Sequence, residues 1–238
     1  MCLEQGQEGQ EVVFLDTLVA NLNRSIFNYP DAIEYLHGRG VSENEIKRYG
    51  IGYGKVVGVP EENSPDRKRF MEESFKGRKF EERVIFPMRD SVGRVIGIIG
   101  RSLTVKGFKI FATDEAKFHG MFVGLYEALP QIYKENRVYV VEGPFDWVTL
   151  VKELPNTVGV MTAGLNESQY WLLKMYCDQI VTVFDSDEAG RRAAESAEKN
   201  FGTMTLDLGY KDPNDCFKLL GSGFRNHVMR KLKDIPTF

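Results

Sequence analysis

Two short apolar runs that each end in acidic residues constrain this 238-residue chain more than any other feature. The first run is Val138-Tyr-Val-Val-Glu-Gly143, and the second is Ile180-Val-Thr-Val-Phe-Asp-Ser-Asp187. Their apolar residues are continuous rather than alternating, which is typical of strands buried on both faces. Helical patterns follow both runs and lie between them, so the sequence predicts a β-α-β-α-β unit with a parallel sheet.

Three acidic residues are expected at one edge of this sheet. Parallel sheets bind ligands beyond the carboxyl ends of their strands, where Glu142, Asp185 and Asp187 fall. Two carboxylates about 4 Å apart repel by roughly 4 kcal/mol at an effective dielectric near 20, so the group needs protons, a base or a divalent cation. Oxygen ligands without His or Cys suit Mg²⁺ or Mn²⁺. Alternatively, Asp187 only caps the next helix and Glu142 is a solvated loop acid, and spacing alone favours neither interpretation.

Composition excludes several classes of protein. No apolar run approaches the roughly 20 residues of a membrane span, and the polar N-terminus lacks a signal-peptide pattern, so we expect a cytosolic protein. Cys2, Cys177 and Cys216 form no C-x-x-C pair, and the histidines do not complete a zinc pattern. We therefore predict no zinc in this chain, and we expect Cys177 and Cys216 to be buried.

Charge is segregated along the chain, although the net charge of -3 argues against a protein that coats nucleic acid over its whole surface. The segment from Asp66 to Lys109 contains twelve Lys and Arg residues but only six Asp and Glu residues. Five bases in and after this segment lie among apolar residues, where a charge needs a partner such as a phosphate: Arg89, Arg94, Arg101, Lys109 and Lys117. The alternative is a solvated hairpin face.

The remaining patterns predict a mixed α/β chain in three parts. Residues 1–135 form an α+β subdomain, with a disordered start over residues 1–10, a helix over residues 11–27 and a hairpin of strands 83–90 and 94–101. Residues 136–210 form an α/β domain with a mostly parallel central sheet flanked by helices. Residues 211–238 form a small helical segment. Within the second part, Trp171, Leu172 and Met175 are expected in the core.

Several motifs resemble a known family. Glu142-Gly-Pro-Phe-Asp146, followed by Asp185-Ser-Asp187 and Glu188-Ala-Gly-Arg-Arg192, resembles the Toprim domain shared by topoisomerases and bacterial-type primases. The hairpin and the segment Gly124-Leu-Tyr-Glu-Ala128 resemble, in order and spacing, the catalytic core of DnaG-type primases. The resemblance covers roughly Ser25 to Leu220.

The resemblance implies synthesis of short RNA primers from NTPs on single-stranded DNA by two-metal nucleotidyl transfer. The implied catalytic and metal-binding residues are Glu142, Asp185 and Asp187, with Asp212 as a further ligand and Asp146 and Asp215 as auxiliary acids. Arg89, Arg94, Arg101, Lys109 and Lys117 would bind nucleotide or DNA phosphates. Two to three Mg²⁺ or Mn²⁺ ions are expected. So are a replicative helicase and a separate zinc-ribbon module as partners, in the cytoplasm of a bacterium or a phage-infected bacterial cell.

The sequence also departs from the family pattern and leaves alternatives open. Many members have Asp where this chain has Asn214, and Asp212 is by itself an ideal helix N-cap. No G-x-x-x-x-G-K-[ST] loop occurs, so no NTP-driven motor is expected. The chain fits either an excised core or a naturally minimal primase such as a phage might encode. The competing functions are another Toprim enzyme, such as a metal-dependent nuclease or a topoisomerase fragment, and a non-catalytic single-stranded DNA-binding module.

Overall fold

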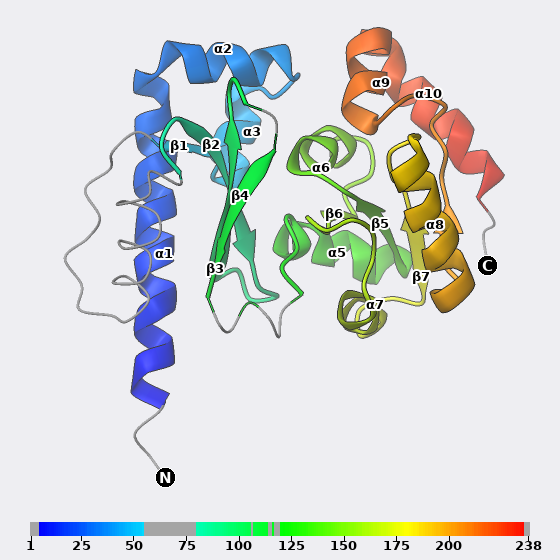
Figure 1. Ribbon diagram of the computed structural model, residues 1–238, viewed down its shortest axis with the longest axis horizontal. Coiled ribbons are helices and arrows are strands. Elements are labelled where there is room, and N and C mark those ends of the chain that lie inside the picture. The colour runs from blue at the N-terminus through cyan, green and yellow to red at the C-terminus, as the bar shows by residue number, and fades with distance from the viewer. Residues whose placement is uncertain (1–4, 55–79, 106, 114–115, 117–119, 236–238) are drawn as a thin grey trace. The chain divides into compact units, whose positions relative to one another are not determined.

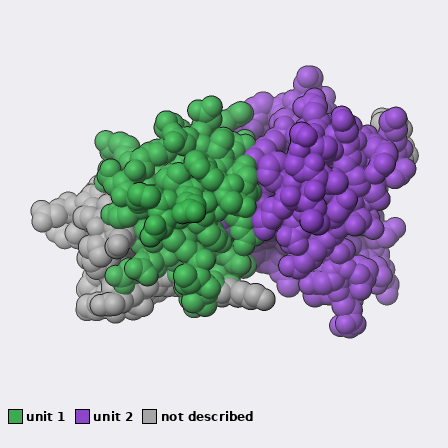
Figure 2. Space-filling model, turned by 90° about the horizontal axis from the view of Figure 1, so that it is seen from above, with its two compact units in different colours: residues 1–121 green, residues 122–238 purple. Residues whose placement is uncertain are grey.

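The computed structural model describes residues 5–54, 80–105, 107–113, 116 and 120–235. Its internal contacts divide the chain into two compact units, residues 1–121 and residues 122–238 (Figures 1 and 2). The subdivision at residues 135 and 210 stays a prediction. No helix in the described ranges is long and apolar enough to cross a membrane.

Unit 1 (residues 1–121) combines helices with an antiparallel sheet (Figure 1). Its helices are α1 (Gln5–Ser25), η1 (Ile26–Asn28), α2 (Pro30–Gly38) and α3 (Glu43–Tyr49). Its strands are β1 (Gly52–Gly54), β2 (Arg83–Arg89), β3 (Val95–Ser102) and β4 (Phe108–Ala112), paired in the order β1-β2-β3-β4. The predicted hairpin is confirmed, because Arg83 on β2 pairs with Ser102 on β3.

Helix α1 covers one face of this sheet. Its apolar residues recur at helical spacing, and Leu15, Leu18 and Leu22 share a buried cluster with Ile85 and Ile98 of the sheet. The expectation of disorder over residues 1–10 is wrong for residues 5–10, because α1 begins at Gln5. Gln and Glu are good helix formers, so the helix extends beyond its apolar pattern.

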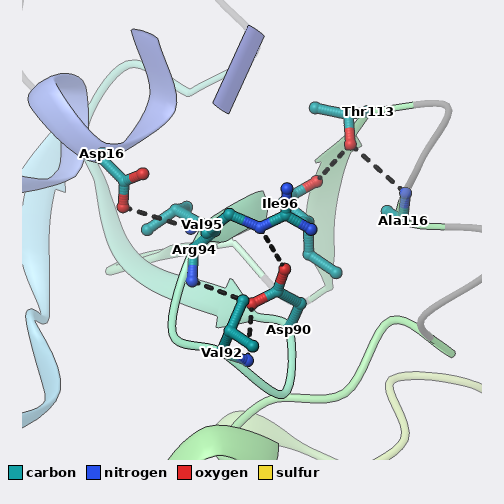
Figure 3. Close-up of polar contacts among 8 residues, drawn as sticks. All are labelled: Asp16, Asp90, Val92, Arg94, Val95, Ile96, Thr113 and Ala116. Atoms are coloured by element: carbon teal, nitrogen blue, oxygen red, sulfur yellow. Dashed lines mark hydrogen bonds and ion pairs between the residues drawn. The ribbon is translucent and has the colours of Figure 1, made fainter. Parts of the chain in front are cut away.

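Two acids fix the turn between β2 and β3 (Figure 3). Asp90 is fully buried, and its carboxylate accepts hydrogen bonds from the amides of Val92 (3.0 Å) and Arg94 (2.9 Å). The same carboxylate forms a 2.6 Å ion pair with Arg94 Nε. Asp16 of α1 accepts a bond from the amide of Val95 (3.2 Å), and burial is the main cause that raises the pKa of Asp16. The turn is therefore tied both to itself and to α1.

Unit 2 (residues 122–238) contains the predicted parallel sheet. Its strands are β5 (Arg137–Val141), β6 (Thr157–Gly159), β7 (Gln179–Thr182) and β8 (Met204–Thr205), in the order β6-β5-β7-β8 with every pair parallel. Its helices are α5 (Leu125–Glu135), α6 (Pro144–Leu150), α7 (Glu167–Lys174), α8 (Glu188–Phe201), α9 (Pro213–Leu220), η4 (Gly221–Gly223), α10 (Phe224–Lys231) and η5 (Leu232–Asp234). The mixed α/β fold with a helix-flanked parallel sheet is confirmed.

Helices pack on both sides of the parallel sheet (Figure 1). On one side, Leu129 of α5, Leu173 of α7 and Ala197 of α8 join a single core cluster with Val138 and Val140 of β5. On the other side lies α6, whose Trp147 is buried and donates its indole N–H to the carbonyl of Thr157 (3.1 Å). Continuous apolar strands are thus covered on both faces, as their sequences predict.

The core residues predicted in and just after α7 differ in their burial. Leu172 is partly buried and packs against the core. Trp171 and Met175 are 60% and 75% exposed, so the prediction that they belong to the core is wrong. Leu173 is fully buried instead, and the partly buried ring of Tyr170 packs against the same core and stacks on Phe201. Cys177 is buried as predicted, and so is Cys216.

The buried carboxylate of Asp90 provides a test of unit 1. Asp90→Ala should lower the free energy of unfolding by about 1–3 kcal/mol, because the amides of Val92 and Arg94 lose their acceptor. Urea denaturation followed by circular dichroism measures this loss. The exposed Glu43→Gln, which breaks a surface pair with Lys47, is the control and should change stability by less than about 0.5 kcal/mol. Equal effects from both variants would contradict the assignment.

Candidate active site

The parallel pairing of β5 and β7 brings Glu142 and Asp185 together. Val140 of β5 pairs with Thr182 of β7, so the residues that follow both strands emerge at the same edge of the sheet. There the amide of Asp185 donates a hydrogen bond to Glu142 Oε1 (3.2 Å). Glu142 is partly buried and bonded, which excludes the interpretation that it is only a solvated loop acid.

Two more acids lie at the N-termini of helices. Asp187 caps α8 by accepting a hydrogen bond from the amide of Gly190 (2.9 Å). Asp212 caps α9 by accepting one from the amide of Asp215 (2.6 Å), and its other oxygen lies 3.6 Å from Lys211 Nζ. The capping interpretation is therefore correct for both residues. The second carboxylate oxygen of Asp187 takes no part in its cap, whereas that of Asp212 already lies near Lys211.

Asp146, in the first turn of α6, completes the group. Its Oδ1 accepts a 3.4 Å hydrogen bond from the amide of Asn214 on α9. Burial raises the pKa of Asp146 well above its ordinary value, with Asp212 and then Asp185 adding repulsion. Glu142, Asp146, Asp185, Asp187 and Asp212 interact electrostatically with one another and are called the acid cluster below.

Burial and repulsion between carboxylates both raise pKa values in the acid cluster. Burial is the largest cause that raises the pKa of Asp185 to about 7, followed by repulsion from Glu142, Asp212 and Asp187. Lys211 opposes this shift. Burial also raises the pKa of Glu142, partly offset by the hydrogen bond from the amide of Asp185. A bound cation would offset both the cost of burying charged carboxylates and the repulsion between them.

The donor set fits a hard divalent cation. All five side chains of the acid cluster offer only carboxylate oxygens, which Mg²⁺ and Mn²⁺ prefer. Among the residues that the structure describes, no three acid, His or Cys side chains converge closely enough to ligate one ion as they stand. Mg²⁺ usually takes only one or two carboxylates and completes its shell with water and substrate phosphates, so pairs of acids suffice.

Asn214 and Asp215, which follow Asp212 in the first turn of α9, form contacts with other residues. Asp215 lies in the first turn of α9, and its side chain forms a 3.6 Å ion pair with Lys218. Asn214 is 2% exposed and donates its side-chain amide to Thr149 Oγ1 on α6 (2.8 Å). In this chain, position 214 therefore joins α9 to α6.

Two of the five predicted phosphate-binding bases already have partners within unit 1. Arg89 donates to the carbonyl of Tyr49 at the end of α3 (3.2 Å) and lies against Gly50. Arg94 pairs with Asp90, although 43% of its side chain remains exposed. Both contacts explain how these charges are tolerated among apolar residues without any ligand.

The other three bases differ. Arg101 Nε is buried without a hydrogen-bond partner among the described residues, and so is Arg83 Nε, whose pKa is lowered by burial and then by Arg101. Lys109 is exposed on β4. Lys117 lies outside the described residues. Arg101 and Lys109 thus fit the predicted phosphate contacts better than Arg89 and Arg94, and the assignment of all five stays a prediction.

Comparison with known proteins matches both units. Residues 20–126 match the model of the DNA primase catalytic core, N-terminal domain, and residues 139–217 match a Toprim-like model. The chain belongs to the DnaG-type primase catalytic cores. The resemblance noted in the motifs is confirmed.

The curated relatives of this chain are longer than the part that it matches. A DNA primase from Chlamydia pneumoniae is 30% identical over 237 residues, which cover 90% of this chain and 40% of the relative. The chain thus spans about two fifths of the length of that curated relative. The solved DnaG primase catalytic domain bound to single-stranded DNA is 26% identical, with a TM-score of 0.76 over 95% of this chain and 83% of that one. The zinc-binding and RNA polymerase domains of the Aquifex aeolicus primase share the fold, with 24% identity and a TM-score of 0.77 over 96% and 61%.

Some residues that shape the acid cluster carry little sequence signal. Gly190 is needed because a Cβ there would lie 2.1 Å from the carbonyl oxygen of Asp185. Lys211 contributes positive charge next to Asp212, and its carbonyl accepts the amide of Ser186 (2.7 Å). The sequence predicts a helix that begins at Glu188, and a glycine in its first turn is the signal that could have identified Gly190.

The raised pKa values predict how stability depends on pH. A carboxyl with a higher pKa in the folded chain keeps its proton longer there, so stability falls as pH rises from its ordinary 3.8 towards about 7 for Asp185. In EDTA, urea unfolding at pH 5 and pH 8 should therefore show a smaller loss in Asp185→Asn than in wild type. The difference should be about 1–2 kcal/mol, because solvent screens this half-exposed group. Identical losses would contradict the pKa shift.

The close approach at Gly190 gives a second test. Gly190→Ala should lower the free energy of unfolding by about 1–3 kcal/mol, because the added methyl group overlaps the backbone of Asp185. The matched control is Gly38→Ala, another helical glycine, whose Cβ would meet no atom within 4 Å. It should leave stability unchanged or raise it by up to about 1 kcal/mol. Thermal and urea unfolding measure both, and tolerance of Ala at position 190 would refute the overlap.

Proposed function

We propose that this primase core is a DNA-directed RNA polymerase that synthesises short RNA primers from NTPs on a single-stranded DNA template. The observation that carries the proposal is the acid cluster, in which the amide of Asp185 bonds Glu142 Oε1 (3.2 Å) and the pKa of Asp185 rises to about 7. Family membership supports the reaction, since the matching domain model is that of a primase catalytic core.

Glu142, Asp185 and Asp187 would hold the divalent ions, with Asp212 as a further ligand and Asp146 as an auxiliary acid. Mg²⁺ is the proposed ion, replaceable by Mn²⁺, and two to three ions match the number of carboxylates. Ions held by these carboxylates would supply Lewis-acid chemistry, lowering the pKa of the attacking 3′-hydroxyl and stabilising the pyrophosphate leaving group.

The chain itself supplies orientation. Asp187 and Asp212 are fixed by their capping bonds, and Glu142 is fixed by the amide of Asp185, so these carboxylates are held before a ligand arrives. Asp215 is a weaker candidate, because its side chain pairs with Lys218.

Phosphate groups of the nucleotide or the template would bind the basic residues. Arg101 and Lys109 are the leading candidates, since Arg101 Nε has no acceptor among the described residues and Lys109 is exposed. Arg94 could contribute through its exposed donors, whereas Arg89 and Lys117 rest on the family resemblance alone. Template binding through so few phosphate contacts should weaken as salt rises.

Single-stranded DNA is the proposed template, as in the solved primase domain bound to single-stranded DNA. A zinc-ribbon module is a proposed partner, because the similar Aquifex aeolicus structure contains a zinc-binding domain beside its RNA polymerase domain. A replicative helicase is the remaining proposed partner.

A primer-synthesis assay tests the proposal. Wild-type protein with labelled NTPs, mixed-sequence single-stranded DNA and Mg²⁺ or Mn²⁺ should yield short RNA products. Asp185→Asn should reduce their formation by about 100-fold or more, because it removes a charged ligand of the ions. The control Glu195→Gln, on the exposed side of α8, should retain wild-type activity.

Each competing function predicts a different result in the same assay. Cleavage of the DNA without RNA synthesis would indicate a metal-dependent nuclease. DNA binding that needs no metal, without synthesis or cleavage, would indicate a binding module. Full activity in Asp185→Asn would refute the role of the acid cluster.

A further inference from the structure

Met161 adopts a backbone conformation that large side chains rarely adopt. It follows β6 with a φ of +54°, in the left-handed region, and its side chain is 4% exposed. Its methyl group packs over Gly159, where it lies 2.5 Å from the position that a Cβ would take. Backbone strain of this kind persists only where the surroundings enforce it, and it is frequent at functional sites.

The unusual turn holds the backbone of Glu142. The ladder between β5 and β6 ends at the pair Val141 and Gly159, yet two more backbone bonds continue beyond it. The amide of Val160 donates to the carbonyl of Val141 (3.0 Å), and the amide of Met161 donates to the carbonyl of Glu142 (3.2 Å). Glu142 is therefore held at its main chain by Met161 and at its carboxylate by the amide of Asp185.

Gln169 of α7 enforces the turn from both sides. This side chain is 1% exposed and donates Nε2–H to the carbonyl of Val160 (3.0 Å). Its Oε1 lies 3.3 Å from Thr162 Oγ1, a hydroxyl that also lies 2.7 Å from the carbonyl of Gly164, so Gln169 contacts the residues on either side of Met161. Gln169 also belongs to the capping box of α7 with Asn166, which offers a purely structural explanation of its burial.

We infer that Gln169, acting through the strained turn at Met161, is a positioning residue that sets the main chain of Glu142 for metal binding. The inference rests on the proposed function, because Glu142 is there a ligand of the divalent ions. It adds a residue to the site that touches neither ions nor substrate. Helix α7 lies on the other face of the sheet from α6. It thereby acts on the acid cluster through Val160, which Gln169 bonds, and through Met161, whose amide bonds the carbonyl of Glu142.

The test compares two variants at the start of α7. Gln169→Met keeps the length of the side chain but loses the bond to the carbonyl of Val160. Asn166→Ala loses the cap on the amide of Gln169 but leaves the bond from Gln169 to Val160 in place. Both should lower the melting temperature. Calorimetric titration with Mn²⁺, without nucleotide, should show affinity weakened about 10-fold in Gln169→Met only.

Primer synthesis gives the second measurement. Gln169→Met should need about 10-fold more Mn²⁺ for half-maximal synthesis, with a rate at saturating Mn²⁺ close to wild type, because the ligands themselves remain. Wild-type Mn²⁺ affinity in Gln169→Met, or equal weakening in Asn166→Ala, would overturn the inference. If Gln169→Met does not fold, Thr162→Val replaces it with the same criteria, because it removes the hydroxyl that lies within bonding distance of Gln169 Oε1, the carbonyl of Val160 and the carbonyl of Gly164.

The two proposals fail differently. A wild-type protein that makes no RNA but binds Mn²⁺ more tightly than Gln169→Met would refute primer synthesis and support the positioning role. A wild-type protein that makes RNA while Gln169→Met shows unchanged Mn²⁺ dependence would do the reverse. Failure of the wild type to bind Mn²⁺ would overturn both.

Discussion

Repulsion between carboxylates at one edge of a parallel sheet is the constraint on which the rest of unit 2 depends. Because β5 and β7 are neighbours, Glu142 and Asp185 lie close together at the ends of these strands. Asp146 and Asp212 add negative charge from the N-termini of two helices. Desolvation and repulsion act in the same direction, since both favour the protonated form of a buried acid. The fold holds the acids in this arrangement in spite of its cost, and perturbed pKa values of this kind cluster at functional sites.

The surrounding structure lowers that cost with dipoles and amides rather than with a set of salt bridges. Asp187 and Asp212 sit at the N-termini of α8 and α9, where unpaired amides and the helix dipole favour negative charge. Glu142 receives the amide of Asp185, and Lys211 supplies one positive charge beside Asp212. Because amides fix each carboxylate without neutralising it, the site stays both oriented and attractive to ions.

The sequence predicts those parts of the site that depend on local pattern. Continuous apolar runs identify β5 and β7, and the rule that ligands bind at the carboxyl ends of strands places Glu142 near Asp185. Contacts between distant residues escape this reasoning. Arg89 meets the carbonyl of Tyr49, forty residues earlier, and Gln169 reaches back to Val160, while the register of α7 that exposes Trp171 depends on packing that no short window contains.

Asp90 and Arg101 show how the structure refines the prediction for the basic hairpin. By sequence both Arg94 and Arg101 are charges among apolar residues, and a phosphate is an equally good partner for each. In the structure Arg94 has its carboxylate, whereas Arg101 Nε is buried without an acceptor in the described part of the chain and lies near the charge of Arg83. A buried donor without an acceptor costs free energy, as does an acid raised in pKa by its neighbours. Unit 1 thus holds a buried guanidinium donor without an acceptor among the described residues, and unit 2 holds a group of mutually repelling carboxylates.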